Sequence, residues 1–195
     1  VDCGITNLTE AKQAREIGID MIITDHHNPL AMLPQAIAVI DPKRKDSRYP
    51  FHELAGVGVA YKLLQALFHK DSREKSLLGL LDLVTLGTVT DMVPIVSENR
   101  YLVKEGLRVL NNTPRIGLQE MVRLAGLELG KLDSENISWV LGPRLNAASR
   151  MDDATISYRL LTTNSLQEAH HLASKLEEKN TERQRLTNEI LNKVK

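Results

Sequence analysis

The feature that most constrains the fold is the alternation of strand-like and helical patterns at the start of the chain. Val1 has the character of a strand end, and Asn7 followed by Glu10 is the pattern of a helix N-terminus. Residues 21–24 and 36–40 are short apolar runs rich in β-branched side chains. The order strand, helix, strand, loop, strand predicts an α/β fold with a parallel, Rossmann-like sheet.

The rest of the chain is dominated by helical periodicity. The predicted helices span residues 56–69, 73–86, 97–111, 114–125 and 134–141. A last helical pattern starts with a capping box at Ser165 and Glu168, and it is apolar at both ends but mostly polar over residues 177–185. Such a helix suits a bridge between two domains, although a terminal helix packed on its own domain would also fit. His170 and His171 are predicted on its solvated side.

Acids and imidazoles cluster where the predicted strands, or their equivalents, end. The cluster comprises Asp2, Asp25, His26, His27 and Asp91. Because ligands of open parallel sheets bind at the carboxyl ends of the strands, these side chains are candidates for one site. Carboxylates with imidazole and without a thiolate cluster suit divalent ions such as Mn²⁺ or Mg²⁺. On the residues alone, Asp2 is equally compatible with a loop acid, and Asp91 with a helix N-cap or turn acid.

Composition limits the other function classes. Lys plus Arg and Asp plus Glu both number 25, so no basic balance indicates nucleic acid, although a neutral chain can still carry a local basic groove. The single cysteine, Cys3, forbids an internal disulfide and fits a reducing cytoplasm. No apolar run approaches the roughly 18 residues of a membrane helix. The chain begins at Val1 and ends within a helical pattern, so we expect a piece of a longer protein.

Four patches of sequence resemble one known family, in the same order. "TDHH" (24–27) is similar to the signature of the DHH phosphoesterases, "VDCGI" (1–5) to their second motif, and "GTVTDMVP" (87–94) to their fourth. "LGPRLNAASRM" (141–151) resembles the RecJ-like branch, whose members are 5′→3′ exonucleases specific for single strands. The resemblance implies hydrolysis of phosphodiesters with two divalent ions, usually Mn²⁺, and single-stranded DNA as the partner.

The resemblance also implies a role for each residue of the predicted site. Asp2 would bridge the two ions, and His26 and Asp91 would be ligands of one of them. His27 would face the scissile phosphate and donate a hydrogen bond or a proton to it. Asp25 would accept a hydrogen bond from an imidazole and fix its tautomer, as ligand histidines commonly require.

The last of the four patches supplies the predicted substrate contacts. Arg144, Asn146 and Arg150 are candidates for binding phosphate, because guanidinium groups match phosphate oxygens. The alternative is salt-bridging between the sheet domain and the tail. Ser149 stands where the family usually has glycine, and it would be strained if that position needs a positive φ. Trp139, the only tryptophan, is predicted to pack in the core or against a helix.

The resemblance further implies that parts of the family's architecture lie outside this sequence. Neither the family's first motif, an Asp-x-Asp with further metal carboxylates, nor the downstream nucleic-acid-binding domain has a counterpart here. Residues 1–163 would be the C-terminal part of a DHH domain, with sheet motifs in 1–55 and a helical region in 56–163. Residues 164–195 would be the helix that leads to the nucleic-acid-binding domain.

These observations predict the core of a metal-dependent RecJ-type exonuclease of DNA repair and recombination, with this piece itself inactive. Two alternatives stay open. One is another DHH phosphodiesterase, acting on oligoribonucleotides, 3′-phosphoadenosine phosphate or cyclic dinucleotides, and the other is a non-catalytic DHH-fold scaffold. Retention of the acids and imidazoles of the cluster favours the enzyme. The uncovered edge of a truncated sheet also predicts self-association.

Overall fold

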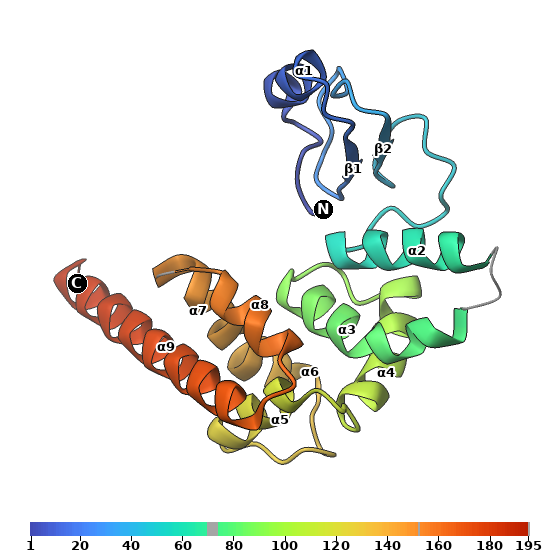
Figure 1. Ribbon diagram of the computed structural model, residues 1–195. Helices are drawn as coiled ribbons and strands as arrows, with labels where there is room; N and C mark the ends of the chain where they lie inside the picture. Colours follow the sequence, from blue (N-terminus) through green and yellow to red (C-terminus); the bar gives the residue numbers. More distant parts are fainter. Residues whose placement is uncertain (70–73, 152, 195) are drawn as a thin grey trace. The chain divides into compact units, whose positions relative to one another are not determined.

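The computed structural model describes residues 1–69, 74–151 and 153–194 (Figure 1). The chain divides into two compact units, Val1–Gly106 and Leu107–Lys195. We call them unit 1 and unit 2 and describe each by itself. Unit 1 combines a small sheet with helices, and the described part of unit 2 is helical.

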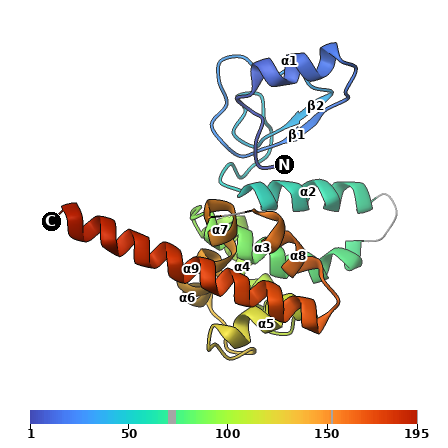
Figure 2. The same ribbon diagram turned by 60° about the vertical axis from the view of Figure 1, so that its left-hand side comes forward.

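The sheet of unit 1 positions the candidate site. This part of the unit comprises Leu8–Glu16 (α1), Ile22–Thr24 (β1) and Ala38–Ile40 (β2). The strands run parallel, with Ile23 opposite Val39, and Figures 1 and 2 both show α1 next to them. The N–H of Asp2 donates to the carbonyl of Thr24 at 2.7 Å, so the start of the chain runs alongside β1. The predicted α/β fold with a parallel sheet is therefore confirmed.

Unit 1 continues as a set of packed helices. They span Gly56–His69 (α2), Glu74–Leu80 (η1, a 3₁₀ helix), Leu81–Thr90 (α3) and Ser97–Leu110 (α4), the last of which runs past the end of the unit. The helix predicted over 73–86 is thus a 3₁₀ segment followed by an α-helix, and residue 73 lies outside the described residues. Helix α4 approaches α3 closely at Gly106, where a Cβ would lie 1.8 Å from Oγ1 of Thr85. Only glycine allows this approach.

Unit 2 is organised around the long last helix. Its elements span Ile116–Leu124 (α5), Ser134–Asn136 (α6), Ile137–Leu141 (η2, a π-helical turn), Gly142–Met151 (α7), Thr155–Thr162 (α8) and Leu166–Val194 (α9). Helix α9 packs against α5, α7 and α8, and Leu172 and Leu176 of its first half are buried (Figure 2). In its second half Ile190 and Leu191 are exposed. The first half therefore packs on its own unit, while the role of the second half as a connection stays a prediction.

The ends of the helices agree in part with the predicted caps. The side chain of Asn7 makes no cap hydrogen bond, so the predicted capping box before α1 is not formed. Thr113 accepts the N–H of Arg115 at 3.2 Å, and Ser165 accepts the N–H of Glu168 at 3.3 Å. Of the two predicted capping boxes, the side chain of Ser165 holds an N–H group at a helix start, whereas that of Asn7 does not. Within the described ranges no helix is both long and apolar enough to cross a membrane.

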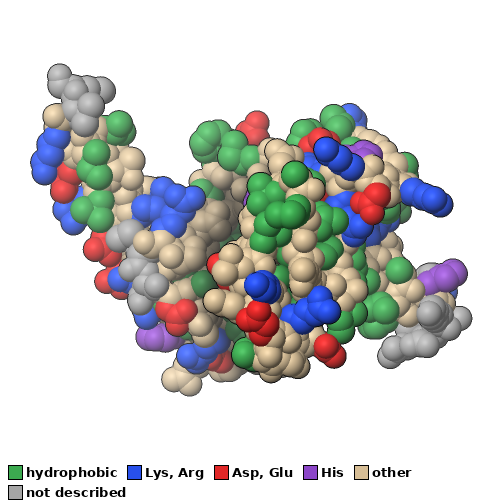
Figure 3. Space-filling model, turned by 90° about the horizontal axis from the view of Figure 1, so that it is seen from above, with side chains coloured by type: hydrophobic (Ala, Val, Ile, Leu, Met, Phe, Trp, Pro, Cys, Tyr) green, Lys and Arg blue, Asp and Glu red, His purple; other side chains and the backbone are tan. Residues whose placement is uncertain are grey.

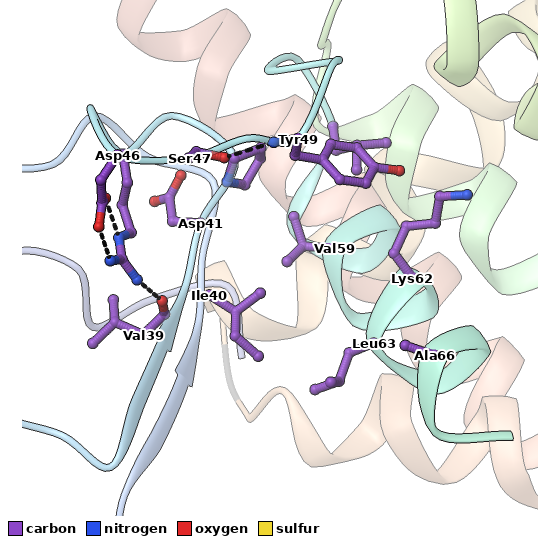
Figure 4. A pocket seen from close by; sticks show the side chains of 13 residues that line it. Val39, Ile40, Asp41, Asp46, Ser47, Tyr49, Val59, Lys62, Leu63 and Ala66 are labelled. Carbon is purple, nitrogen blue, oxygen red and sulfur yellow. Dashed lines mark hydrogen bonds and ion pairs between the residues drawn. The ribbon is translucent and has the colours of Figure 1, made fainter. Parts of the chain in front are cut away.

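A cavity of about 430 Å³ lies in unit 1 between the end of β2 and α2 (Figure 4). Figure 4 shows Val59 of α2 and Ile40 of β2 on its walls. Next to it, Nη1 of Arg44 donates to the carbonyl of Val39, and the same guanidinium pairs with Asp46. Because the carbonyl of Ile40 points towards β1, that of Val39 points to the outer edge of β2. Arg44 therefore covers part of that edge, as charged side chains often do.

Candidate metal centre

Asp25, the first residue after β1, is a buried carboxylate that organises the loop around it. Its Oδ2 accepts the N–H of Ile5 at 2.9 Å, and its Oδ1 accepts the N–H of His26 at 2.8 Å. The same Oδ1 lies 2.7 Å from Nδ1 of His27. Burial opposes ionisation of Asp25, but the hydrogen bonds from Ile5 and the two histidines outweigh it and lower the pKa. Asp25 is therefore a fixed anion that orients the turn containing both imidazoles.

His26 is a buried imidazole whose polar atoms are not satisfied by the protein. Its side chain is 7% exposed, and neither ring nitrogen makes a hydrogen bond within the described residues. Nε2 lies 3.1 Å from Oδ1 of Asp2 and 3.4 Å from Oδ2 of Asp91, close contacts that lack hydrogen-bond geometry. Buried polar groups normally have partners, so an orphaned imidazole between two carboxylates needs an explanation. Nitrogen and oxygen donors converging in this way fit a divalent ion.

Asp2 reaches the cluster through two backbone features. Its φ is 61°, in the left-handed region that a non-glycine residue adopts uncommonly. Gly56, the first residue of α2, leaves room for its carboxylate, since a Cβ there would lie 2.0 Å from Oδ1 of Asp2. Gly56 was not among the predicted site residues, because the sequence shows there only a glycine at the start of a helical pattern. The position of the predicted bridging carboxylate therefore depends on a residue from a different element.

Asp91 comes from the end of a helix rather than from a strand. It is the C-cap of α3, and its N–H donates to the carbonyl of Gly87 at 2.9 Å. The next residue, Met92, has a φ of 61°, so the chain leaves the helix in a left-handed turn directly after the acid. A carboxylate at a helix C-terminus faces the negative end of the helix dipole, which disfavours its charge. A bound cation would offset that cost.

His27 lies at the surface of the same cluster. Its side chain is 58% exposed, and its ring centroid is 4.5 Å from that of His26. The hydrogen bond to Asp25 raises the pKa of His27, and partial burial opposes the shift. With Nδ1 held by Asp25, Nε2 is the nitrogen left to donate to a ligand. The ligand atoms of Asp2, His26 and His27 lie within 4.8 Å of one another, so distance alone admits His27 as a metal ligand too.

The predicted phosphate contacts lie together on α7 in unit 2. Asn146 and Arg150 are exposed, whereas Arg144 is engaged. Nη2 of Arg144 donates to Glu177 of α9 at 3.0 Å, and its Nη1 donates to the carbonyl of Val140 at 2.8 Å. Arg144 thus forms a salt bridge to the tail helix, as one of the two sequence-based alternatives proposed. Phosphate binding by Arg144, Asn146 and Arg150 stays a prediction.

The expectation for Trp139 is wrong, and the condition set for strain at Ser149 is not met. Ser149 lies inside α7 and is not among the residues with positive φ, so no strain arises from a positive φ there. Trp139 is 78% exposed and does not pack in the core. The π-helical turn explains this, because Ile137 and Leu141, both fully buried, take the core positions and leave Trp139 on the outer side.

His170 and His171 are exposed on α9, as predicted, but His170 also has a carboxylate partner. Its Nδ1 lies 2.6 Å from Oε1 of Glu120, a nearly buried carboxylate of α5. Arg123 donates to the same carboxylate at 2.7 Å. The hydrogen bond from Arg123 and that from His170 lower the pKa of Glu120 to about 2, and burial opposes them only in part. This cluster joins α5 to α9 within unit 2.

The chain is similar to known proteins along nearly its whole length. Residues 1–88 match the DHH family, N-terminal domain. The single-stranded-DNA-specific exonuclease RecJ of Bacillus subtilis (strain 168) is 43% identical over 190 residues, which cover 97% of this chain and 24% of that protein. RecJ of Escherichia coli (strain K12) is 39% identical over 95% of this chain and 34% of its own length. The chain thus spans about a quarter to a third of these relatives.

Solved structures give the same relationship. RecJ from Thermus thermophilus in complex with Mn²⁺ is 36% identical, with a TM-score of 0.87 over 99% of this chain and 29% of that chain. RecJ from the same organism in complex with Mg²⁺ is 33% identical, with a TM-score of 0.73 over 90% of this chain and 26% of that chain. The chain therefore carries a DHH-family N-terminal domain in residues 1–88 and is homologous along nearly its whole length to a segment of RecJ exonucleases.

Proposed function

We propose that this chain is the core of a RecJ-type 5′→3′ exonuclease that hydrolyses single-stranded DNA with Mn²⁺ or Mg²⁺. The observation that carries the proposal is the orphaned, buried imidazole of His26 between the carboxylates of Asp2 and Asp91. The relatives named above are single-stranded-DNA-specific exonucleases, and structural relatives hold Mn²⁺ or Mg²⁺. A non-catalytic scaffold would have no need to keep an imidazole buried without a partner.

The proposed metal ligands are Asp2, His26 and Asp91, with Asp2 as the residue that bridges two ions. When bound, divalent ions supply Lewis acidity and a hydroxide nucleophile near neutral pH. Asp91 is assigned as a ligand in preference to His27, because its carboxylate faces Nε2 of His26 at 3.4 Å, whereas His27 is already held by Asp25. The protein contributes by fixing these donors before the substrate arrives.

His27 is proposed to act on the substrate. Its Nδ1 donates to Asp25, so Nε2 is the ring nitrogen that remains available to a ligand. The hydrogen bond to Asp25 raises the pKa of His27 and fixes which ring nitrogen is held by the protein. Such a group donates a hydrogen bond to a phosphate oxygen or a proton to the leaving oxygen.

Substrate binding is proposed to involve α7. Asn146 and Arg150 are exposed and available as direct contacts to phosphate. Arg144 is proposed as a contact too, but its bonds to Glu177 and to the carbonyl of Val140 also hold the start of α7 in place. The architecture proposed for the longer protein is a DHH domain ending near residue 163 and a connecting helix over 164–195, in a cytoplasmic enzyme.

Self-association through the sheet is proposed as a property of this piece. The outer edge of β2 is partly covered by Arg44, so the edge proposed to pair is the one beside Val1 and Asp2. Hydrophobic side chains are exposed in the same unit, as the face in Figure 3 illustrates, and they include Ile19, Ile22 and Ile37. Exposed apolar surface of this kind favours association.

The metal assignment is tested by titrating Mn²⁺ into the 195-residue chain. Binding is expected to be weak, because the family's upstream carboxylates are outside the sequence, and His26→Ala is expected to remove it. His52→Ala is the matched control, since His52 is an exposed histidine of the same unit. Submicromolar affinity that His26→Ala leaves unchanged would refute the assignment. The chain itself is expected to show no nuclease activity.

A further inference from the structure

The exposed tryptophan of unit 2 is the strongest feature that the proposed function does not use. Trp139 is 78% exposed, while Ile137 and Leu141 on either side of it are fully buried. Tryptophan is among the residues that gain most from burial, so leaving the only one in the chain exposed forgoes a large hydrophobic contribution. π-helical turns such as the one that carries it are frequent at functional sites.

Trp139 shares the solvent side of its helix with two of the predicted phosphate contacts. η2 and α7 are continuous, and two exposed residues follow Trp139 along them, seven and eleven positions later. Those positions are Asn146 and Arg150, both exposed, whereas Ala147 and Ala148 face the core. We call Trp139, Asn146 and Arg150 the α7 track. It is about 16 Å long at the rise of an α-helix.

The backbone under Trp139 is held in place. Nη1 of Arg144 donates to the carbonyl of Val140, the residue after the tryptophan, and its Nη2 donates to Glu177 of α9. The π-helical turn is thus tied to the longest helix of the unit. An aromatic ring on a fixed backbone loses little conformational entropy when a ligand covers it, which favours binding.

The chemistry of the α7 track fits a nucleic acid strand better than a protein surface. The centre of a protein interface is usually a continuous apolar patch, whereas the exposed residues that follow Trp139 on α7 carry an amide (Asn146), a hydroxyl (Ser149) and a guanidinium (Arg150). Single-strand-binding surfaces combine aromatic rings, on which bases stack, with cationic groups that follow the phosphates. Glu135, one turn before Trp139, is exposed and would repel phosphate, so the phosphates are expected towards Arg150.

We propose that Trp139 is a stacking platform for a base of single-stranded nucleic acid, with Asn146 and Arg150 contacting the adjoining backbone. The inference rests on the proposed function, because it supplies a strand-binding surface for that activity. Stacking of one base on one aromatic ring corresponds to roughly a 5- to 150-fold gain in affinity. The stacking would not depend on base identity.

Trp139 itself provides the assay, because it is the only tryptophan and all tryptophan fluorescence of the chain comes from it. We would titrate the 195-residue chain with oligo-dT in low salt and a metal chelator, which prevents cleavage. Saturable quenching is expected, together with an anisotropy change of labelled oligo-dT at the same concentrations. An abasic oligonucleotide of equal length is expected to bind without quenching.

Variants separate stacking from a general loss of structure. Trp139→Ala should weaken oligo-dT binding by roughly 5- to 150-fold in anisotropy, and Trp139→Phe should restore most of it. Arg150→Gln should weaken binding and lower its salt dependence. Tyr158→Ala is the matched control, since Tyr158 is an exposed aromatic residue of the same unit, and it should bind like the unchanged chain.

The inference would be overturned if oligo-dT bound without quenching, or if the abasic oligonucleotide quenched the fluorescence equally. It would also be overturned if the fluorescence changed with protein concentration in the absence of DNA, because Trp139 would then lie in a contact between copies. Absence of any binding to oligo-dT would overturn it as well. If a longer protein with the Asp-x-Asp motif is an active exonuclease while Trp139→Ala binds normally, the inference fails and the proposed function stands. If quenching is observed but that protein is inactive with Mn²⁺, the function fails and the inference stands.

Discussion

Gly56→Ala tests whether the carboxylate of Asp2 holds a metal from the position seen here. The added Cβ would lie 2.0 Å from Oδ1 of Asp2 and 2.6 Å from its Cγ. An ordinary contact between these atoms begins near 3.4 Å, so Oδ1 must retreat by about 1.4 Å. The side chain of Asp2 is 57% exposed and is free to move towards solvent. The substitution should therefore displace the carboxylate without unfolding the protein.

The size of the effect follows from the tolerance of metal sites. Distances between Mn²⁺ or Mg²⁺ and carboxylate oxygens hold to within about 0.2 Å, so a displacement of 1.4 Å takes Asp2 out of the ligand set. Disturbing the groups that orient ligands costs about 10- to 100-fold in metal affinity, and losing a ligand should cost at least that. The crowding of Asp2, whose Cβ would also lie 2.9 Å from the new methyl group, should cost about 1–3 kcal/mol of stability.

The assay is Mn²⁺ binding followed by the electron paramagnetic resonance signal of the free ion, with thermal unfolding measured on the same samples. Gly58→Ala is the matched control, because it lies in the same helix and its Cβ would meet only the flexible end of Leu54 at 3.3 Å. Gly58→Ala should bind Mn²⁺ like the unchanged chain. Unchanged Mn²⁺ affinity in a folded Gly56→Ala protein would show that Asp2 does not hold the ion from this position.

Three further predictions concern the histidines, acid stability and assembly. In a longer protein that contains the Asp-x-Asp motif, His27→Ala should lower turnover on single-stranded DNA by about 10²-fold or more and leave the Mn²⁺ affinity unchanged. His26→Ala should lower both the turnover and the Mn²⁺ affinity. The reverse pattern would exchange the roles of the two histidines. Because the pKa of Glu120 is lowered to about 2 from 4.5, its charged form, which is held by hydrogen bonds to Arg123 and His170, stabilises the fold above pH 4.5. This stability should be lost as the pH falls from about 4.5 towards 2. Urea unfolding across that range should show a weaker pH dependence in Glu120→Gln. Light scattering should show concentration-dependent self-association of the 195-residue chain, and a strictly monomeric species would contradict the proposed sheet edge.

The parts of the site that local sequence determines were predictable. The run before Asp25 is apolar and β-branched, and the polar residues follow at once, so both the end of β1 and the cluster of Asp25, His26 and His27 could be read from consecutive residues. The parallel pairing with β2 followed from the connection between elements. Most helices after residue 56 were found for the same reason, because their periodicity is a property of neighbouring residues, but α7 and α8 were not predicted.

The parts that depend on distant residues were not predictable. Gly56 matters because of its distance to Asp2, which lies in a different element, and nothing in its own sequence context shows that approach. Asp91 ends a helix, and only the folded chain brings it to His26. Trp139 has the composition of a core residue, and its exposure arises from a π-helical turn, which has no recognised local sequence signal here.

Several unfavourable local features of unit 1 lie together at the candidate metal centre. Asp2 and Met92 have left-handed backbones, at a cost of about 1 kcal/mol or more each. His26 is buried without a hydrogen-bond partner among the described residues, and Asp91 places a negative charge at the C-terminus of α3. A sequence selected for stability alone would replace these residues at little loss. Since a ligand that binds only the folded state returns stability by mass action, binding of the proposed divalent ion would offset part of these costs.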